Sequence, residues 1–124
     1  MEIQIALAAS TLVLKHGKQT EITLGDSTIW YTYNDGEFRS QGDSFVELKT
    51  LRTPVDKRGT GSARAIMEHF LKLTDKAGLE VRLEAAPLDA ATKSAKLVKF
   101  YKTFGFKTKG RGFSGETNMV RKAQ

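Results

Sequence analysis

The chain has 124 residues, enough for one domain spanning residues 1–124 with its own core and not comfortably enough for two. It contains no cysteine, which excludes disulfides, thiolate-bound metals and a cysteine nucleophile. The formal net charge of +6 favours anionic partners, either a phosphorylated cofactor or nucleic acid, although solubility alone explains such a charge in many proteins.

The N-terminal segment, residues 1–15, is apolar. Ile3, Ile5 and Leu7 alternate with other residues and predict one face of a strand. Glu2 stands where a secretory signal peptide would carry a cation, and the apolar run is too short to span a bilayer. We therefore expect a cytoplasmic protein with no membrane partner.

The rest of the first half is rich in strand-forming residues. Strands are predicted over residues 11–15, 19–24, 27–33 and 44–53. His16-Gly17-Lys18 predicts a hairpin turn between the first two of these strands, and Pro54 ends the last one.

In the second half, the apolar residues recur at helical spacing. A helix is predicted from Ser62 to Ala77, ended by Gly78, and a second from about Thr92 to Phe104, ended by Gly105. Strands are predicted over residues 79–87, 106–109 and 118–122. The predicted order is a β-meander followed by β-turn-α-β-α-β-β.

A flexible cationic turn, Arg58-Gly59-Thr60-Gly61-Ser62-Ala63, precedes the first helix. The N-terminus of a helix presents unpaired N–H groups and partial positive charge, so this turn predicts a phosphate site. It is not a nucleotide-triphosphate loop, because no lysine follows Gly61. Gly59, Gly61 and Glu84 match parts of a dinucleotide fingerprint, but Arg64 is too bulky for its third glycine position.

The same turn resembles the pyrophosphate loop of the GNAT superfamily, the acetyl-CoA-dependent N-acetyltransferases. Leu97 to Phe106, "LVKFYKTFGF", is similar to the fourth-helix segment of that family. The two motifs stand in the family's order, and the resemblance covers about residues 45–106. The spacing and the segment "APLDAATKSAKLVKFY" are most similar to small phage-encoded members; the anti-CRISPR acetyltransferases are comparably small.

The resemblance implies an α/β (α+β) GNAT-like fold, with a mixed central sheet of about six or seven strands and two main helices. The two helices that the family usually has between its first two strands are not apparent in this sequence. Ser94 stands seven residues before Tyr101, where the family often has asparagine, and Pro54 lies four residues before Arg58 rather than three.

The resemblance also implies a binding site for acetyl-CoA as co-substrate. Backbone N–H groups from Gly59 to Ala63 would hold the pyrophosphate, with charge-assisted bonds from Lys57 or Arg58. The strand end before the loop would hold the pantetheine and polarise the acetyl carbonyl. The expected cofactor-binding residues are Leu51, Arg52, Thr53, Lys57, Arg58, Gly59, Thr60, Gly61, Ser62, Ala63 and Ser94.

Tyr101 matches the general acid of the family, which would protonate or hydrogen-bond the leaving thiolate; otherwise it is a core aromatic of the helix. Glu47, eleven residues before Arg58, matches the base of the histone acetyltransferase branch. Glu84 on the next strand is the competing base, and water serves in many relatives. With two distant histidines and no cysteine, we expect no metal.

The function expected from the resemblance is transfer of an acetyl group to a primary amine of an unidentified protein or small molecule, by direct attack in a ternary complex. Two alternatives stay open. One is a basic nucleic-acid-binding module, suggested by the charge and by residues 106–113, where cations alternate with glycine and aromatics. The other is a CoA-binding pseudoenzyme that acts through a protein partner. A homodimer is also left open.

Overall fold

The computed structural model describes residues 12, 14–35, 44–57, 59–85, 94–111 and 117–124. These form a mixed sheet of six strands, two α-helices and a short 3-10 helix, and from residue 19 onward their order is the one predicted. The elements are β1 (Gln19–Leu24), β2 (Ser27–Asn34), β3 (Phe45–Arg52), η1 (Val55–Lys57), α3 (Ser62–Lys76), β4 (Glu80–Ala85), α4 (Ser94–Lys102), β5 (Lys107–Arg111) and β6 (Thr117–Arg121).

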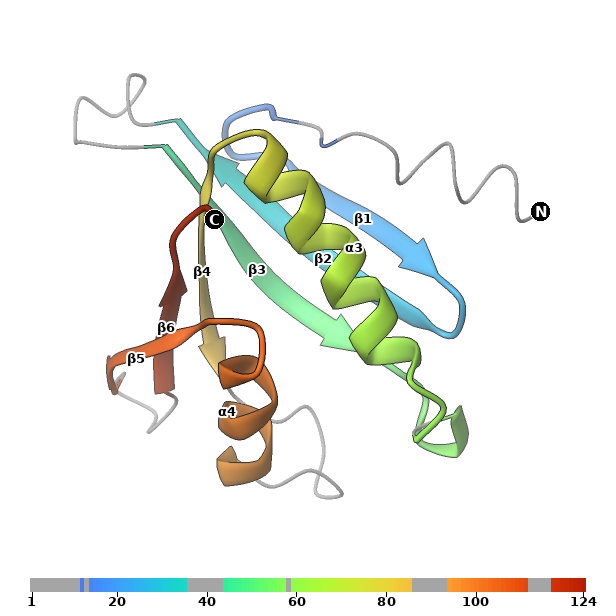
Figure 1. Cartoon of the computed structure of the whole chain (residues 1–124). Coiled ribbons are helices and arrows are strands. Elements are labelled where there is room, and N and C mark those ends of the chain that lie inside the picture. Colours follow the sequence, from blue (N-terminus) through green and yellow to red (C-terminus); the bar gives the residue numbers. More distant parts are fainter. Residues whose placement is uncertain (1–11, 13, 36–43, 58, 86–93, 112–116) are drawn as a thin grey trace.

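Both helices lie on the same face of the sheet (Figure 1). The strand order is β1-β2-β3-β4-β6-β5, and of these pairs only β3 and β4 run parallel. Parallel neighbours need a crossover, and α3 provides it between β3 and β4. Between residues 12 and 35, where the structure describes all positions but one, there is no helix.

The hairpin predicted at His16-Gly17-Lys18 is wrong. Residues 12, 14 and 15 are not in a strand, and His16 instead forms an isolated bridge with Tyr33 of β2. The partner of β1 is β2, joined to it by the two-residue turn Gly25-Asp26. A two-residue turn suits a hairpin, and β2 offers the longer run of β-branched and aromatic residues. The expected strand around Ile3, Ile5 and Leu7 lies outside the described residues.

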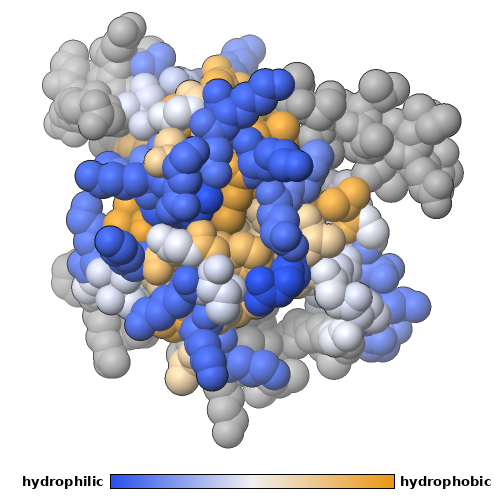
Figure 2. Space-filling view, in the orientation of Figure 1, coloured by the Kyte–Doolittle hydropathy of each residue, from blue (hydrophilic) through white to orange (hydrophobic). Residues whose placement is uncertain are grey.

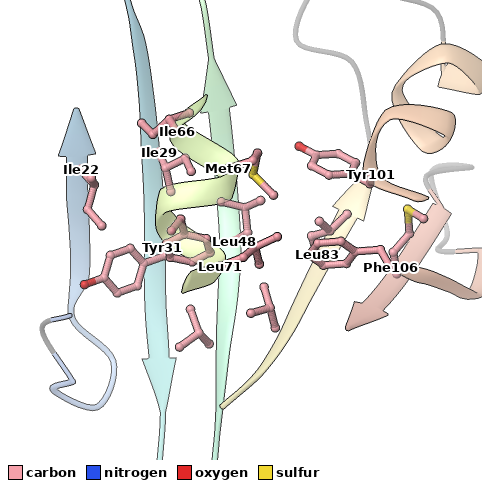
Figure 3. Packing of buried hydrophobic residues seen from close by; sticks show 14 of the residues in the cluster. Ile22, Ile29, Tyr31, Leu48, Ile66, Met67, Leu71, Leu83, Tyr101 and Phe106 are labelled. Carbon is pink, nitrogen blue, oxygen red and sulfur yellow. The ribbon is translucent and has the colours of Figure 1, made fainter. Parts of the chain in front are cut away.

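The core lies between the sheet and the two helices. Along α3 the buried side chains recur on one face, and they are Ile66, Met67, Phe70, Leu71 and Thr74. The ring of Phe70 packs 5.4 Å from that of Tyr31 on β2. Tyr101 of α4 packs against Phe106 and joins the same cluster (Figure 3). The glycines predicted to end the two helices do so: α3 ends at Lys76 and α4 at Lys102, and Gly78 and Gly105 adopt the left-handed conformation just beyond them.

The sheet opens between its two parallel strands. β3 pairs with β4 only from Phe45 to Leu48, and beyond that point β3 continues against β2 alone (Figure 1). Lys49 is the extra residue of a β-bulge there, because Leu48 and Thr50 face consecutive residues of β2. The backbone of residues 49–52 therefore has no strand partner on its β4 side among the described residues.

Candidate functional site

A cleft of about 460 Å³ opens where β3 leaves β4, between the start of α3 and the side of α4. Figure 2 shows hydrophobic side chains at the surface between the two helices, bordered by hydrophilic ones. The cleft is lined by Leu51, Thr53, Lys57, Gly59, Gly61, Ser62, Ala63, Arg64, Lys96, Leu97 and Phe100.

The first turn of α3 presents unused N–H groups to this cleft. Gly61 is the N-cap residue, with φ 85° and ψ 3°, and no side chain in the described part of the chain caps the helix. Gly59 also adopts a positive φ, of 84°. Glycine adopts this conformation without the steric cost that other residues incur, so the two glycines bring the chain into the helix with its N–H groups open. An uncapped N-terminus of this kind attracts anions.

A group of hydroxyls fixes the start of α3 against the β1–β2 turn. The Oγ of Ser62 accepts a bond from the backbone N–H of Asp26 at 3.0 Å and another from the hydroxyl of Ser27 at 3.1 Å. The hydroxyl of Ser27 also contacts that of Thr53, which follows β3. The start of α3, where phosphate would bind, is thus held directly by Asp26 and Ser27 and indirectly, through Ser27, by Thr53. The hydroxyls of Ser62 and Thr53 both take part in these bonds.

The cations of the cleft come from three elements. Lys57 belongs to η1, Arg64 to α3 and Lys96 to α4. The guanidinium of Arg64 lies 4.8 Å from the ring centre of Phe104 and donates a hydrogen bond of 3.2 Å to the hydroxyl of Thr103. Arg64 therefore spans from α3 to the end of α4 and closes one side of the cleft.

The structure brings together most of the expected cofactor-binding residues. Seven of them line the cleft, namely Leu51, Thr53, Lys57, Gly59, Gly61, Ser62 and Ala63. Arg52 is exposed at the end of β3 and does not line it, and the hydroxyl of Thr60 donates to the carbonyl oxygen of Lys57 at 2.9 Å. Arg58 lies outside the described residues, as does the side chain of Ser94, the first residue of α4.

Four of the residues that line the first cleft were not predicted from the sequence, nor was the serine that bonds to the start of α3. Arg64, Lys96, Leu97 and Phe100 line the cleft, and Ser27 supports it from the β1–β2 turn. The helical periodicity placed Leu97 on the same face as Tyr101, so the pattern of α4 could have indicated Leu97, whereas Phe100 was not part of that pattern. Nothing local in the sequence indicates the link between Ser27 and Ser62, because they lie 35 residues apart.

Tyr101 is a core residue whose hydroxyl has no hydrogen-bond partner among the described residues. Its side chain is 5% exposed, and its ring packs edge-on against Phe100 and Phe106 at 5.5 and 5.7 Å. The hydroxyl points away from Phe106, toward the side of Met67 (Figure 3). Burial raises the pKa of the Tyr101 phenol well above its ordinary value, so the group stays protonated at neutral pH. Phe100, rather than Tyr101, lines the cleft as it stands.

The two candidate bases share a second cleft, of about 320 Å³. Side chains alternate along β3, and Val46 and Leu48 are buried beneath the helices, so Glu47 lies on the opposite face of the sheet. Glu84 lines the same cleft, and Glu47 forms an ion pair with Lys49 at 3.3 Å. The cleft lies beside the point where β3 leaves β4. The full lining is Phe45, Glu47, Arg82, Leu83, Glu84, Lys109, Asn118, Met119 and Val120.

The described residues also bear on metal binding and on membrane insertion. In the described ranges, no three histidine, cysteine or carboxylate side chains gather where they could hold a metal ion. No helix of the described chain is both long and apolar enough to cross a bilayer.

Comparison with known proteins identifies the fold. No protein-family model matches the chain, and neither does the sequence of any curated protein. The structure is similar to that of the anti-CRISPR protein AcrVA5, with a TM-score of 0.61 and 18% identity over 82% of this chain and 96% of that one. The chain has the fold of the GNAT acetyltransferases.

Two other similar structures carry the same GNAT fold on longer chains. A histone acetyltransferase HPA2 and related acetyltransferase of Corynebacterium glutamicum has a TM-score of 0.62 and 18% identity over 79% of this chain. Naa50 of Arabidopsis thaliana, in complex with the bisubstrate analogue CoA-Ac-MVNAL, has a TM-score of 0.57 and 22% identity over 76%. The chain spans only 57% and 62% of the lengths of these two proteins. Identities this low show a shared fold.

Proposed function

We propose that the chain is a single-domain N-acetyltransferase that passes the acetyl group of acetyl-CoA to a primary amine by direct attack in a ternary complex. The observation that carries this proposal is the uncapped start of α3, which opens through two left-handed glycines into a cleft beside the separated end of β3. The complex of Naa50 with a CoA-containing analogue supports it, because that protein has the same fold.

The residues of the first cleft fit an acyl-CoA. N–H groups of Ser62 and Ala63 would bind the pyrophosphate, and Lys57 and Lys96 would add positive charge. Leu51, Leu97 and Phe100 offer apolar surface to the pantetheine chain. The cofactor supplies an acetyl group activated as a thioester. The backbone N–H groups of β3 beyond Leu48, which have no strand partner on the β4 side among the described residues, would stabilise negative charge on the acetyl oxygen.

Chemistry would then occur between β3 and β4. The amine nitrogen bonds to the acetyl carbon, the carbon–sulfur bond breaks, and the amine loses one proton. Glu47, lining the second cleft, would accept that proton directly or through water. The Tyr101 hydroxyl, kept protonated by burial, would donate a hydrogen bond to the departing sulfur.

Calorimetry with acetyl-CoA is the first test, followed by labelled acetyl transfer to a lysate. We expect binding of one acetyl-CoA per chain, weakened by added CoA, and label transferred to amines. A chain that shows no heat of binding at millimolar acetyl-CoA is not an acetyltransferase. Binding without transfer to any acceptor would instead favour the pseudoenzyme.

A nucleic-acid-binding module is the second candidate. Residues 94–111 contain no acidic side chain, and their lysines, Lys96, Lys99, Lys102, Lys107 and Lys109, are all exposed. Such a cationic segment favours a polyanion. Binding to DNA that falls steeply with salt, in a chain that does not bind acetyl-CoA, would support this function over acetyl transfer.

Several expectations from the sequence stay predictions. They are the phage-encoded origin, the cytoplasmic location and the homodimer.

A further inference from the structure

Arg82 of β4 lines the second cleft, and only part of its guanidinium group bonds to other described residues. Its Cζ lies 3.8 Å from the ring centre of Phe45, and its Nε donates to the carboxylate of Glu80 at 2.6 Å. Stacking and one hydrogen bond fix the plane of the group. The two terminal nitrogens make no hydrogen bond or ion pair to another described residue, and the side chain is 43% exposed. This is a pre-oriented fork for a carboxylate or a phosphate.

Charges of both signs surround this fork. Arg82 pairs in register with Glu47 on β3, and Glu84 follows it on the same face of β4. Lys109 lines the cleft from β5. The same cleft therefore offers carboxylates that could bind an ammonium group and cations that could bind an acid group.

The position of the fork connects it to the chemistry. Leu48 and Leu83 are the last residues paired between β3 and β4 before the two strands separate. Glu47 and Arg82 are the pair just before them. The acetyl group of a cofactor bound from the helix face would reach this same opening. A molecule in the second cleft could therefore place an amine at the acetyl carbon while a second group remains on Arg82.

We propose that the acceptor is a small amine that carries its own acid group, a carboxylate or a phosphate. Arg82 binds the acid group through its terminal nitrogens, and Glu47 faces the amine. This inference rests on the proposed function. A volume of about 320 Å³ suits a molecule the size of an amino acid.

The test is a panel of matched amines with acetyl-CoA, in which each acid is compared with its neutral partner. β-Alanine is compared with its amide, aspartate with asparagine, and phosphoethanolamine with the methyl ether of ethanolamine. The first two pairs test a carboxylate, and the third tests a phosphate. Product is measured by mass spectrometry. We expect kcat/KM to be about tenfold or more higher for the acid member of at least one pair.

Variants then assign the preference to Arg82. Arg82→Gln should raise KM for the preferred acid about tenfold or more, with kcat little changed, and Arg82→Lys should recover part of the loss. Lys107→Gln is the matched control: it removes one cation from the same sheet but lies outside the cleft lining, so it should leave both constants unchanged. Circular dichroism and acetyl-CoA calorimetry verify that each variant is folded.

Three results would overturn the inference. One is equal or better transfer to the neutral members, another is no transfer to any member of the panel, and the third is an unchanged preference in Arg82→Gln. Acetyl-CoA binding in the same samples separates this failure from a failure of the proposed function, because the wild type would still bind acetyl-CoA if only the acceptor class is wrong.

Discussion

Arg121 of β6 holds both carboxylate oxygens of Asp75, near the end of α3, at 2.6 and 2.9 Å. The same guanidinium donates its Nε hydrogen to the carbonyl oxygen of Phe104 at 2.7 Å, just after α4. The backbone N–H of Gln124 also donates to Asp75, at 3.1 Å. The side chain of Arg121 thus bonds β6 to the C-terminal end of α3 and to the residues just after α4. Since α3 and α4 border the first cleft, this contact helps set the spacing between them.

Asp75→Asn should lower the free energy of unfolding by about 2 kcal/mol at pH 7, because Arg121, 7% exposed, would lose its charged partner. Urea denaturation measures the loss. Glu68→Gln removes an exposed carboxylate from the same helix and should change stability by about 0.5 kcal/mol or less. Equal effects of the two substitutions would contradict a structural role for the pair.

The stabilisation by Asp75 should depend on pH in a defined direction. The hydrogen bond from Arg121 lowers the pKa of the Asp75 carboxyl in the folded protein. Its contribution is therefore complete above the ordinary aspartate pKa of about 3.9, and is lost as pH falls through the lower folded value. The stability difference between wild type and Asp75→Asn should be constant from pH 7 to about 5 and shrink below pH 4. A difference that stays constant down to pH 2 would rule out this linkage.

Gly61→Ala should weaken acetyl-CoA binding about tenfold or more. Its added Cβ would meet no atom of the described residues within 4 Å, and Gly61 lines the cleft, so the methyl group would occupy space needed by phosphate. Its positive φ of 85° adds a strain of about 1–2 kcal/mol. Gly78→Ala is the matched control, since Gly78 has φ 69° and equally open surroundings outside the cleft. Both variants should lose similar stability, and only Gly61→Ala should lose affinity by calorimetry.

Tyr101→Phe separates catalysis from packing, because it removes one hydroxyl and keeps the ring. If the hydroxyl assists departure of the thiolate, turnover should fall about 10²-fold while acetyl-CoA affinity holds and stability changes by about 1 kcal/mol or less. Tyr33→Phe removes a hydroxyl from a half-buried tyrosine outside both clefts and should leave turnover intact. Equal turnover of Tyr101→Phe and wild type, with chemistry rate-limiting, would remove Tyr101 from the mechanism.

Glu47→Gln should lower turnover most at low pH, where little of the acceptor is present as free amine, and should be partly rescued at high pH. The measurement is the pH profile of kcat with a competent amine. Glu84→Gln tests the competing base in the same cleft. If Glu84→Gln reproduces the expected profile and Glu47→Gln does not, the base is Glu84; if neither variant changes it, water acts as the base.

Local chemistry in the sequence predicted the second half of the chain well. Helical spacing and a terminal glycine located α3 and α4, because both signals act within one or two turns. The glycines at 59 and 61 predicted the left-handed turn before α3, since positive φ is a property of single residues. The same reasoning failed at His16-Gly17-Lys18, where the turn residues were present but the choice of strand partner depended on the rest of the sheet.

The sequence by itself thus determined the elements from residue 19 onward, their order and the glycine turn. Only the tertiary structure decided that Ser27 anchors Ser62, that Arg121 joins both helix ends, and that Arg82 stacks on Phe45 beside Glu47. The physical reason is that these contacts depend on sheet register and on where the parallel strands separate. A shift of one residue in either strand would turn Glu47 and Arg82 to opposite faces of the sheet, and no local pattern in the sequence specifies that alignment.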